Sequence, residues 1–207
     1  MTTRSIFSTG ITPRNNQGGS GEAKNQRTGN ALIDLRIAEL AEKGMIQPFH
    51  NDCVQPCSYD VHLGPTLLVE TEDGFTKVDI SDRSEREPLQ MPPGAFALGE
   101  TVEYLDIPNN VEAHLHLVSS RAREGLNHSL AGLVDAGFKG VLTLELKNIL
   151  QYGFIPLYPG LRIAQLTFFE YADEANQPYR GRYFEDTRVS MRKGGKDLLV
   201  TQGIQDL

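Results

Sequence analysis

Glu145 is the side chain in this sequence best placed to transfer protons. It lies in the alternating run 141–146, which puts it on the same strand face as Val141 and Thr143. The opposite face carries Leu142, Leu144 and Leu146. A carboxyl group among apolar neighbours has a raised pKa, which brings it towards the range where it can act as both acid and base. The alternative is a solvent-facing glutamate without a chemical role.

Thiol and imidazole side chains fall short of a metal site. Cys53 and Cys57 have only His50 nearby, and two thiols with one imidazole are fewer than the ligands of a structural zinc site. His114 and His116 share the polar face of an alternating strand, which favours a solvated or interface role over metal binding. We therefore expect no metal site in the chain, and two free cysteines fit a reducing cytoplasm.

Composition and charge exclude several partners. The chain has 207 residues, 39% of them hydrophobic, with a formal net charge of −7 and a pI near 5.2. This acidic balance argues against binding a nucleic-acid backbone, although a single nucleotide needs only a local basic pocket. No apolar run approaches the roughly 18 residues of a membrane span, so no membrane partner is expected.

The chain divides by composition into three parts. Residues 1–29 are rich in Ser, Thr, Asn, Gln and Gly and are expected to form a disordered polar tail. An organelle transit peptide is the alternative, because Glu22 is the only acid of that segment. Residues 30–171 are expected to form the catalytic domain, and the polar residues 172–207 a C-terminal tail or lid.

The central part has a strand-like pattern after one short helix. Asp34 can cap a helix over 35–43, and Gly44 can end it. Alternating strand patterns follow, the clearest being 111–117, 141–146 and 161–168. Turn signals separate them at Pro92–Gly94, Pro108–Asn110, Gly137 and Pro159–Gly160. Many short strands with regular turns predict an all-β barrel or jelly-roll with a short N-terminal helix.

Four segments stand out, in the order 55–64 (QPCSYDVHLG), 119–126 (SSRAREGL), 128–148 (HSLAGLVDAGFKGVLTLELKN) and 160–166 (GLRIAQL). Together they resemble the strand signature, the phosphate- and water-binding segment, the active-site core and the following strand of the dCTP deaminases, a family of the dUTPase-like superfamily. The resemblance covers about residues 31–183. It implies a dUTPase-like β-barrel and a homotrimer with active sites between subunits.

The resemblance also implies a role for each site residue. Glu145 would be the general base and acid of hydrolytic deamination, with Ser119 and Arg123 positioning the water and Arg123 a candidate for a neighbour's site. Ser120 would contact phosphate, and Asp135 the 3′-hydroxyl of the deoxyribose. The remaining substrate contacts would come from Thr143, Tyr179, Arg182 and Asp186. The alternatives are a simple turn at the two serines and a surface ion pair for Arg123.

The sequence lacks both zinc-deaminase signatures, His-x-Glu and Pro-Cys-x-x-Cys, so water activation without zinc is expected. Mg²⁺ is expected to arrive bound to the triphosphate.

Glu145 favours a deaminase, because simple dUTPases lack a glutamate there. Ala131 and Gly132 are closer to the bifunctional members, which carry dCTP through to dUMP and pyrophosphate. We expect deamination of dCTP to dUTP and ammonia, and the continuation to dUMP stays open. The alternatives are a dUTP pyrophosphatase and a catalytically weak, nucleotide-binding regulatory trimer.

The chain departs from the family pattern at four positions. Val118 and His62 each stand where the family usually has arginine. In the tail, Asp186 and Arg188 replace the usual Gln and Gly. An aspartate near phosphates repels them unless Mg²⁺ bridges the two or the tail runs elsewhere.

Overall fold

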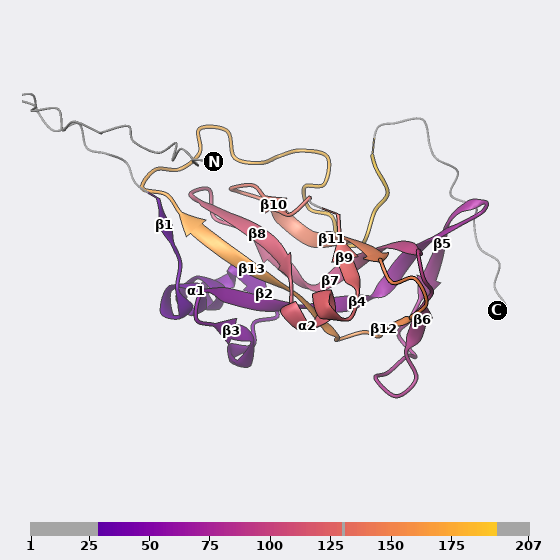
Figure 1. The fold of residues 1–207 in the computed structure, drawn as a ribbon. Helices are drawn as coiled ribbons and strands as arrows, with labels where there is room; N and C mark the ends of the chain where they lie inside the picture. Colours follow the sequence, from indigo (N-terminus) through magenta and orange to yellow (C-terminus); the bar gives the residue numbers. More distant parts are fainter. Residues whose placement is uncertain (1–28, 130, 194–207) are drawn as a thin grey trace, which may run out of the picture.

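The computed structural model describes residues 29–129 and 131–193 (Figure 1). The segment expected to be a disordered tail, residues 1–29, lies outside the described residues except for Gly29. Of the expected C-terminal tail, residues 172–193 are described. They run without regular helix or strand back past β10 and β11 (Figure 1).

The predicted N-terminal helix is present as α1, Asp34–Leu40, followed by a π-helical turn at Ala41–Met45. Asp34 is the first helical residue rather than the N-cap, which is Ile33, and its carboxylate accepts a hydrogen bond from the Leu35 amide at 2.7 Å. Gly44 has a φ of 104°, a conformation that glycine adopts easily, and so ends the helical segment as predicted.

Most of the strands form one curled antiparallel sheet, which makes a half-barrel (Figure 1). Its main path runs β10-β8-β13-β4-β7-β11-β9, with β1 on β13, β2 on β7, and β3 and β5 on β4; β6 and β12 pair separately. The strands are β1 Asn30–Ala31, β2 Ile46–Gln47, β3 Val54–Gln55, β4 Ser58–Thr71, β5 Gly74–Asp79, β6 Leu89–Met91, β7 Phe96–Asp106, β8 Val111–Leu117, β9 Leu126–His128, β10 Leu133–Val134, β11 Lys139–Asn148, β12 Ile155–Leu157 and β13 Arg162–Glu170.

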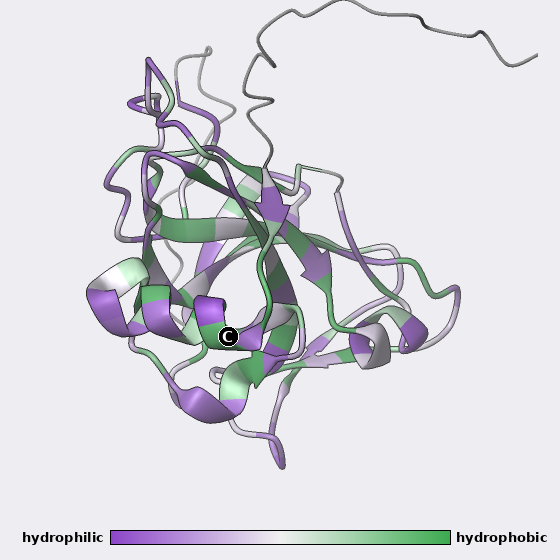
Figure 2. Cartoon of the chain, turned by 90° about the vertical axis from the view of Figure 1, so that its left-hand side faces the viewer, coloured by the Kyte–Doolittle hydropathy of each residue, from purple (hydrophilic) through white to green (hydrophobic). Residues whose placement is uncertain are grey.

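The sequence pattern and the sheet agree closely. Predicted strand 111–117 coincides with β8, 141–146 lies within β11, and 161–168 overlaps β13. Each predicted turn signal joins two strands. On β8 the apolar residues Val111, Ala113 and Leu115 are buried. Figure 2 shows hydrophobic stretches along the central strands, whereas the outer helices and loops carry both hydrophilic and hydrophobic residues. The expected all-β architecture with a short N-terminal helix is confirmed.

One of the elements that the sequence did not predict is a second short helix. Ser119–Arg123 forms a second short helix, α2, directly after β8. The amide of Glu124 donates to the Ser120 carbonyl at 3.0 Å, which closes the helical turn. All three expected site residues of this stretch, Ser119, Ser120 and Arg123, are exposed.

Candidate active site

The Glu145 side chain lines a cavity of about 530 Å³, a size typical of small-molecule sites. One wall is apolar and comes from Phe75, Phe96 and Leu98. β11 and the segment before it supply the floor, and residues between Tyr179 and Arg192 supply the outer wall. This cavity combines apolar surface with a few polar groups, and we name it the Glu145 pocket.

The electrostatics of Glu145 agree with the sequence prediction. Its side chain is half-buried on β11, and this burial raises the pKa of the carboxyl group above its ordinary value. The nearby His128 acts in the opposite direction and lowers the pKa. A carboxyl group with this shift holds its proton more strongly than a solvated glutamate does, which suits a group that must both take and return protons.

The two faces of β11 are arranged largely as predicted. Val141, Thr143 and Glu145 all line the pocket, while Leu144 and Leu146 are buried in the core. Leu142 differs from the prediction, because it is only partly buried and also lines the pocket. The reason is a register shift between Val141 and Thr143, which interrupts the simple alternation.

This register shift is large and is held by a side chain of β7. Val141 pairs with Tyr104, whereas Thr143 pairs with Glu100, so residues 101–103 of β7 oppose Leu142 alone. The Thr101 hydroxyl accepts a hydrogen bond from the Leu142 amide at 3.0 Å and donates one to the Glu103 carbonyl at 2.8 Å. Thr101 therefore replaces the missing ladder bond and fixes the floor of the pocket.

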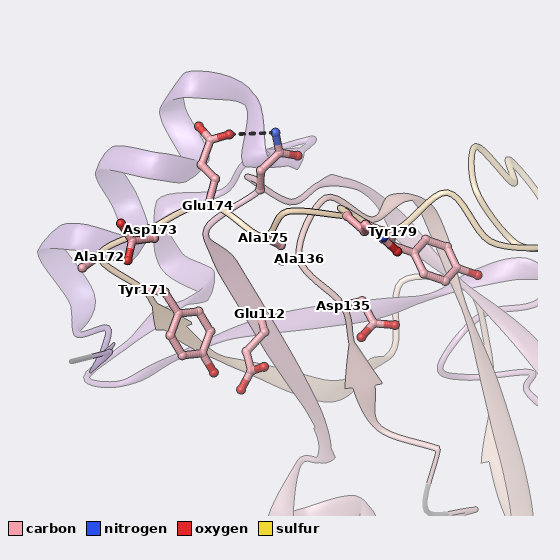
Figure 3. A pocket seen from close by; sticks show the side chains of 11 residues that line it. Glu112, Asp135, Ala136, Tyr171, Ala172, Asp173, Glu174, Ala175 and Tyr179 are labelled. Carbon is pink, nitrogen blue, oxygen red and sulfur yellow. Dashed lines mark hydrogen bonds between the residues drawn. The ribbon is translucent and has the colours of Figure 1, made fainter. Parts of the chain in front are cut away.

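Asp135 and Tyr179 mark one end of the Glu145 pocket. Asp135 follows β10 directly and is exposed. The Tyr179 amide donates to the Ala136 carbonyl at 2.8 Å, and its ring lies 5.7 Å from that of Phe138. Two residues expected to bind substrate, far apart in the sequence, are thus brought to one place (Figure 3).

A second cavity adjoins the first at these two residues. It has a volume of about 600 Å³ and includes Asp135, Tyr179, Glu112, Asn109 and Glu174 (Figure 3). The Asn109 amide donates to the Glu174 carboxylate at 3.3 Å. We place the candidate active site in the Glu145 pocket, because that cavity combines a carboxyl group of raised pKa with an apolar wall.

The C-terminal segment closes the outer side of the Glu145 pocket. The Glu185 amide donates to the Lys139 carbonyl, and the Val141 amide to the Asp186 carbonyl, both at 2.8 Å, so the segment pairs with the edge of β11. Asp186 lines the pocket, as expected for a substrate-binding residue. Its carboxylate accepts a hydrogen bond from the Ser190 hydroxyl at 2.9 Å and pairs with Lys193, which offsets its charge.

Arg182 belongs to the same segment but does not line the pocket. Its guanidinium group donates to the Lys193 carbonyl at 3.0 Å. The tail is thus held by contacts within itself as well as by β11.

Ser119, Ser120 and Arg123 are not brought to Glu145 within one chain. They lie on α2, exposed, and none of them lines the Glu145 pocket.

Gly132 lies close to β8. A Cβ at this position would be 2.7 Å from the Leu115 carbonyl oxygen, so the packing requires glycine there.

His62, another departure from the family pattern, lies outside the Glu145 pocket. Its Nδ1 is 2.6 Å from a carboxylate oxygen of the buried Glu103, and the same carboxylate accepts the His62 amide at 2.9 Å. This pair lines a separate small cavity that also contains Cys53. His62 therefore serves the packing of β4 against β7.

Cys53 is buried and Cys57 exposed, and both are free thiols. Across residues 29–129 and 131–193, no three His, Cys, Asp or Glu side chains gather as a metal ion would require. No helix in the same ranges is long and apolar enough to cross a membrane.

The chain belongs to the dCTP deaminase-like family, whose model matches residues 31–171. Among curated relatives, a protein of Corynebacterium diphtheriae named "dCTP deaminase, dUMP-forming" is 36% identical over an alignment of 157 residues, and the match covers 70% of this chain and 83% of that protein. A Mycobacterium avium protein of the same name is also 36% identical, over 79% of this chain and 88% of its own.

The fold is shared with a solved 2′-deoxycytidine 5′-triphosphate deaminase from Agrobacterium tumefaciens, at a TM-score of 0.58 and 23% identity. The match covers 70% of this chain and 49% of that chain. The fold expected from the resemblance is therefore confirmed.

Several residues of the pocket were not predicted from the sequence. Phe75, Phe96 and Leu98 come from strands that carry no motif. Met191 and Arg192 lie beyond residue 183, where the family resemblance ends. Glu100 and Glu103, two charged residues inside the largely apolar run 95–105, were a usable signal in the sequence, although neither lines this pocket.

Proposed function

We propose that this protein catalyses the hydrolytic deamination of dCTP to dUTP and ammonia. The observation that carries the proposal is the half-buried Glu145, whose pKa is raised by burial, in a pocket built from the family's active-site segment. The curated relatives named dCTP deaminase support the choice of substrate.

In the proposed reaction Glu145 moves protons at three points. It takes a proton from water as the oxygen attacks C4 of cytosine, passes this proton to N3, and then carries the second water-derived proton from the C4 hydroxyl to the departing amino group, which leaves as ammonia while the C4 carbonyl forms. Thr143 lies beside Glu145 on the same strand face and would contact the base, while Asp135 would hold the deoxyribose. Tyr179 and Asp186 would close the pocket over the nucleotide.

A complete site requires a second subunit. Ser119, Ser120 and Arg123 are exposed on α2, away from the Glu145 pocket of their own chain. We propose a homotrimer in which α2 of one subunit faces the Glu145 pocket of its neighbour. Ser119 and Arg123 would then position the attacking water and Ser120 would contact phosphate.

We further propose that the enzyme continues to dUMP and pyrophosphate. The relatives' names include "dUMP-forming", and Ala131, which lines the pocket, precedes the glycine that packs against β8. Mg²⁺ would enter as part of the magnesium–triphosphate substrate. No zinc is required in this scheme, and cytoplasmic nucleotide pools would supply the substrate.

One assay separates the candidate functions: incubation with dCTP and Mg²⁺, followed by quantification of ammonia, dUTP and dUMP. Ammonia with dUMP supports the full proposal, and ammonia with dUTP supports deamination alone. Hydrolysis of added dUTP without ammonia from dCTP would establish a dUTP pyrophosphatase instead. Tight dCTP binding without turnover would indicate a regulatory trimer. A zinc-specific chelator should leave ammonia release unchanged.

A further inference from the structure

Glu100 is a buried carboxylate that the proposed reaction does not use. It lies on β7, with 2% of its surface exposed, next to the register shifts that β7 makes with both β4 and β11. Gly64 of β4 leaves room for it, because a Cβ at Gly64 would be 2.7 Å from the Glu100 Cγ. A carboxylate this deeply buried destabilises the fold unless hydrogen bonds satisfy it.

The partners of Glu100 come from the C-terminal segment. The Val189 amide donates to one carboxylate oxygen at 2.7 Å, and the Arg188 guanidinium group lies 3.5 Å from the other. Within the part of the chain that the structure describes, both hydrogen bonds of this carboxylate go to that segment. Arg188 is 69% exposed, so the shorter bond from the Val189 amide is the stronger of the two.

Apolar contacts support the same attachment. The Val189 side chain is buried in a small cluster with Leu68 and Leu98, against which Met191 also packs. Leu98 and Met191 line the Glu145 pocket as well. The point at which the segment is attached to the sheet is therefore continuous with the pocket wall.

We propose that Glu100 is a positioning residue: its carboxylate holds the C-terminal segment closed, and the closed segment completes the Glu145 pocket. If the segment opened, the Glu100 carboxylate would be left buried without its strongest hydrogen bond, which favours the closed state. Arg188, which replaces a family glycine, adds a weaker contact to the same carboxylate. The kinetic part of this inference rests on the proposed function, whereas the closure of the segment does not.

The test compares Glu100→Ala with Glu100→Gln and Arg188→Ala. Hydrogen exchange of the peptide 183–193, measured without nucleotide, should accelerate about tenfold to a hundredfold in Glu100→Ala, as expected for the loss of a hydrogen bond to a buried charge. Glu100→Gln keeps an oxygen that accepts the Val189 amide, so its exchange should lie close to that of the wild type. Arg188→Ala should change exchange by no more than about fivefold, because an exposed ion pair contributes little.

The kinetic measurement uses the same proteins. In Glu100→Ala the KM for dCTP should rise about tenfold or more, while kcat at saturating dCTP changes much less, because closure is then supplied by bound nucleotide. Glu100→Gln should restore most of the lost affinity. An equal fall of kcat in Glu100→Ala and Glu100→Gln, with KM unchanged, would overturn the positioning role.

Val189→Pro covers the case in which Glu100→Ala does not fold. It removes the amide donor from the segment and leaves the sheet and the carboxylate intact. We expect it to reproduce the fast exchange of peptide 183–193 and the raised KM. Wild-type exchange in Val189→Pro would overturn the inference even if the protein proves to be an active deaminase. Fast exchange in a protein that does not deaminate dCTP would instead retain the closure and reject the proposed function.

Discussion

Strand β11 and helix α2 both carry expected catalytic residues, but the structure treats them differently. β11 lies inside the sheet between β7 and β9, and its Glu145 side chain is half-buried in a formed pocket. α2 is five residues long, and its expected site residues, Ser119, Ser120 and Arg123, are exposed. In the proposed site, one chain therefore forms the half around Glu145, here called the finished half, and exposes the half on α2, here called the displayed half, on its surface.

The largest expected effect comes from the finished half. Glu145→Gln keeps the size of the side chain but cannot accept a proton, so ammonia release from dCTP should fall by about 10²–10⁴-fold. Binding of dCTP, measured by calorimetry, should survive because Asp135 and the C-terminal segment remain. Pyrophosphate release from added dUTP should suffer less, since attack at phosphorus need not use the same proton path. Normal ammonia release by this variant would remove the main reason to prefer a deaminase.

Substitution of Arg123 in the displayed half should lower activity almost as strongly, and the effect should depend on which chain is the neighbour in the trimer. Arg123→Ala should lower ammonia release by about 10²-fold, typical for loss of a group that stabilises the reacting atoms. Trimers assembled from equal amounts of Arg123→Ala and Glu145→Gln chains should recover about a quarter of wild-type activity, because only one site in four then combines an intact Glu145 with an intact neighbouring Arg123. No recovery on mixing, in trimers verified by native mass spectrometry, would place both residues in one chain.

A smaller, graded effect is expected from pH. As a general base Glu145 must be ionised, and burial raises its pKa, so kcat/KM should fall by about tenfold per pH unit below that pKa, beginning at a higher pH than for an ordinary glutamate. A pH–rate profile measures this directly. A profile flat down to the pKa of a solvated glutamate would contradict the burial of the active carboxyl group.

The raised pKa of Glu145 also makes the stability of the fold depend on pH. The folded state binds the Glu145 proton more tightly than the unfolded state does. The protonated group therefore stabilises the fold fully below the unfolded pKa, and this contribution is lost as pH rises through the raised folded pKa. Glu145→Gln has no titrating group at this position, so the loss of stability at rising pH should not occur in this variant. Its Tm at neutral pH should therefore equal or exceed that of the wild type.

The smallest effect is expected for Ser120→Ala on α2. Loss of one neutral hydrogen bond to phosphate should raise the KM for dCTP by about three- to tenfold and leave kcat nearly unchanged. Steady-state kinetics with Ser81→Ala as a matched control, an exposed serine that lies outside α2 and outside the lining of the Glu145 pocket, would measure it. An equal change in both variants would show that the phosphate does not reach α2.

The features that were predicted correctly depend on residues that are close together in the sequence. The alternation of β8, the position of Glu145 on β11 and the end of the helical segment at Gly44 all follow from neighbours in the sequence. Leu142 was misplaced because the register shift depends on Thr101, a residue of another strand. α2 was not predicted, because its five residues carry no apolar periodicity, and a simple turn was only the alternative for its two serines.

The pocket itself was only partly predictable. Glu145, Thr143 and Asp135 come from one contiguous segment, which the family resemblance identified. Phe75 and Phe96 form an aromatic pair across β5 and β7, and such a contact depends on the sheet order. Whether α2 meets the pocket of a neighbour depends on assembly, which a single sequence does not encode in any short pattern.

The pairing of the C-terminal segment with β11 also has a consequence for solubility. β9 covers β11 only at residues 146–148, and the hydrogen bonds to Glu185 and Asp186 occupy backbone groups at the other end of that edge. An unpaired strand edge is a template on which further chains add and aggregate. A chain shortened to end before residue 185 should therefore lose more than its pocket wall: it should precipitate at concentrations at which the full-length protein stays dispersed.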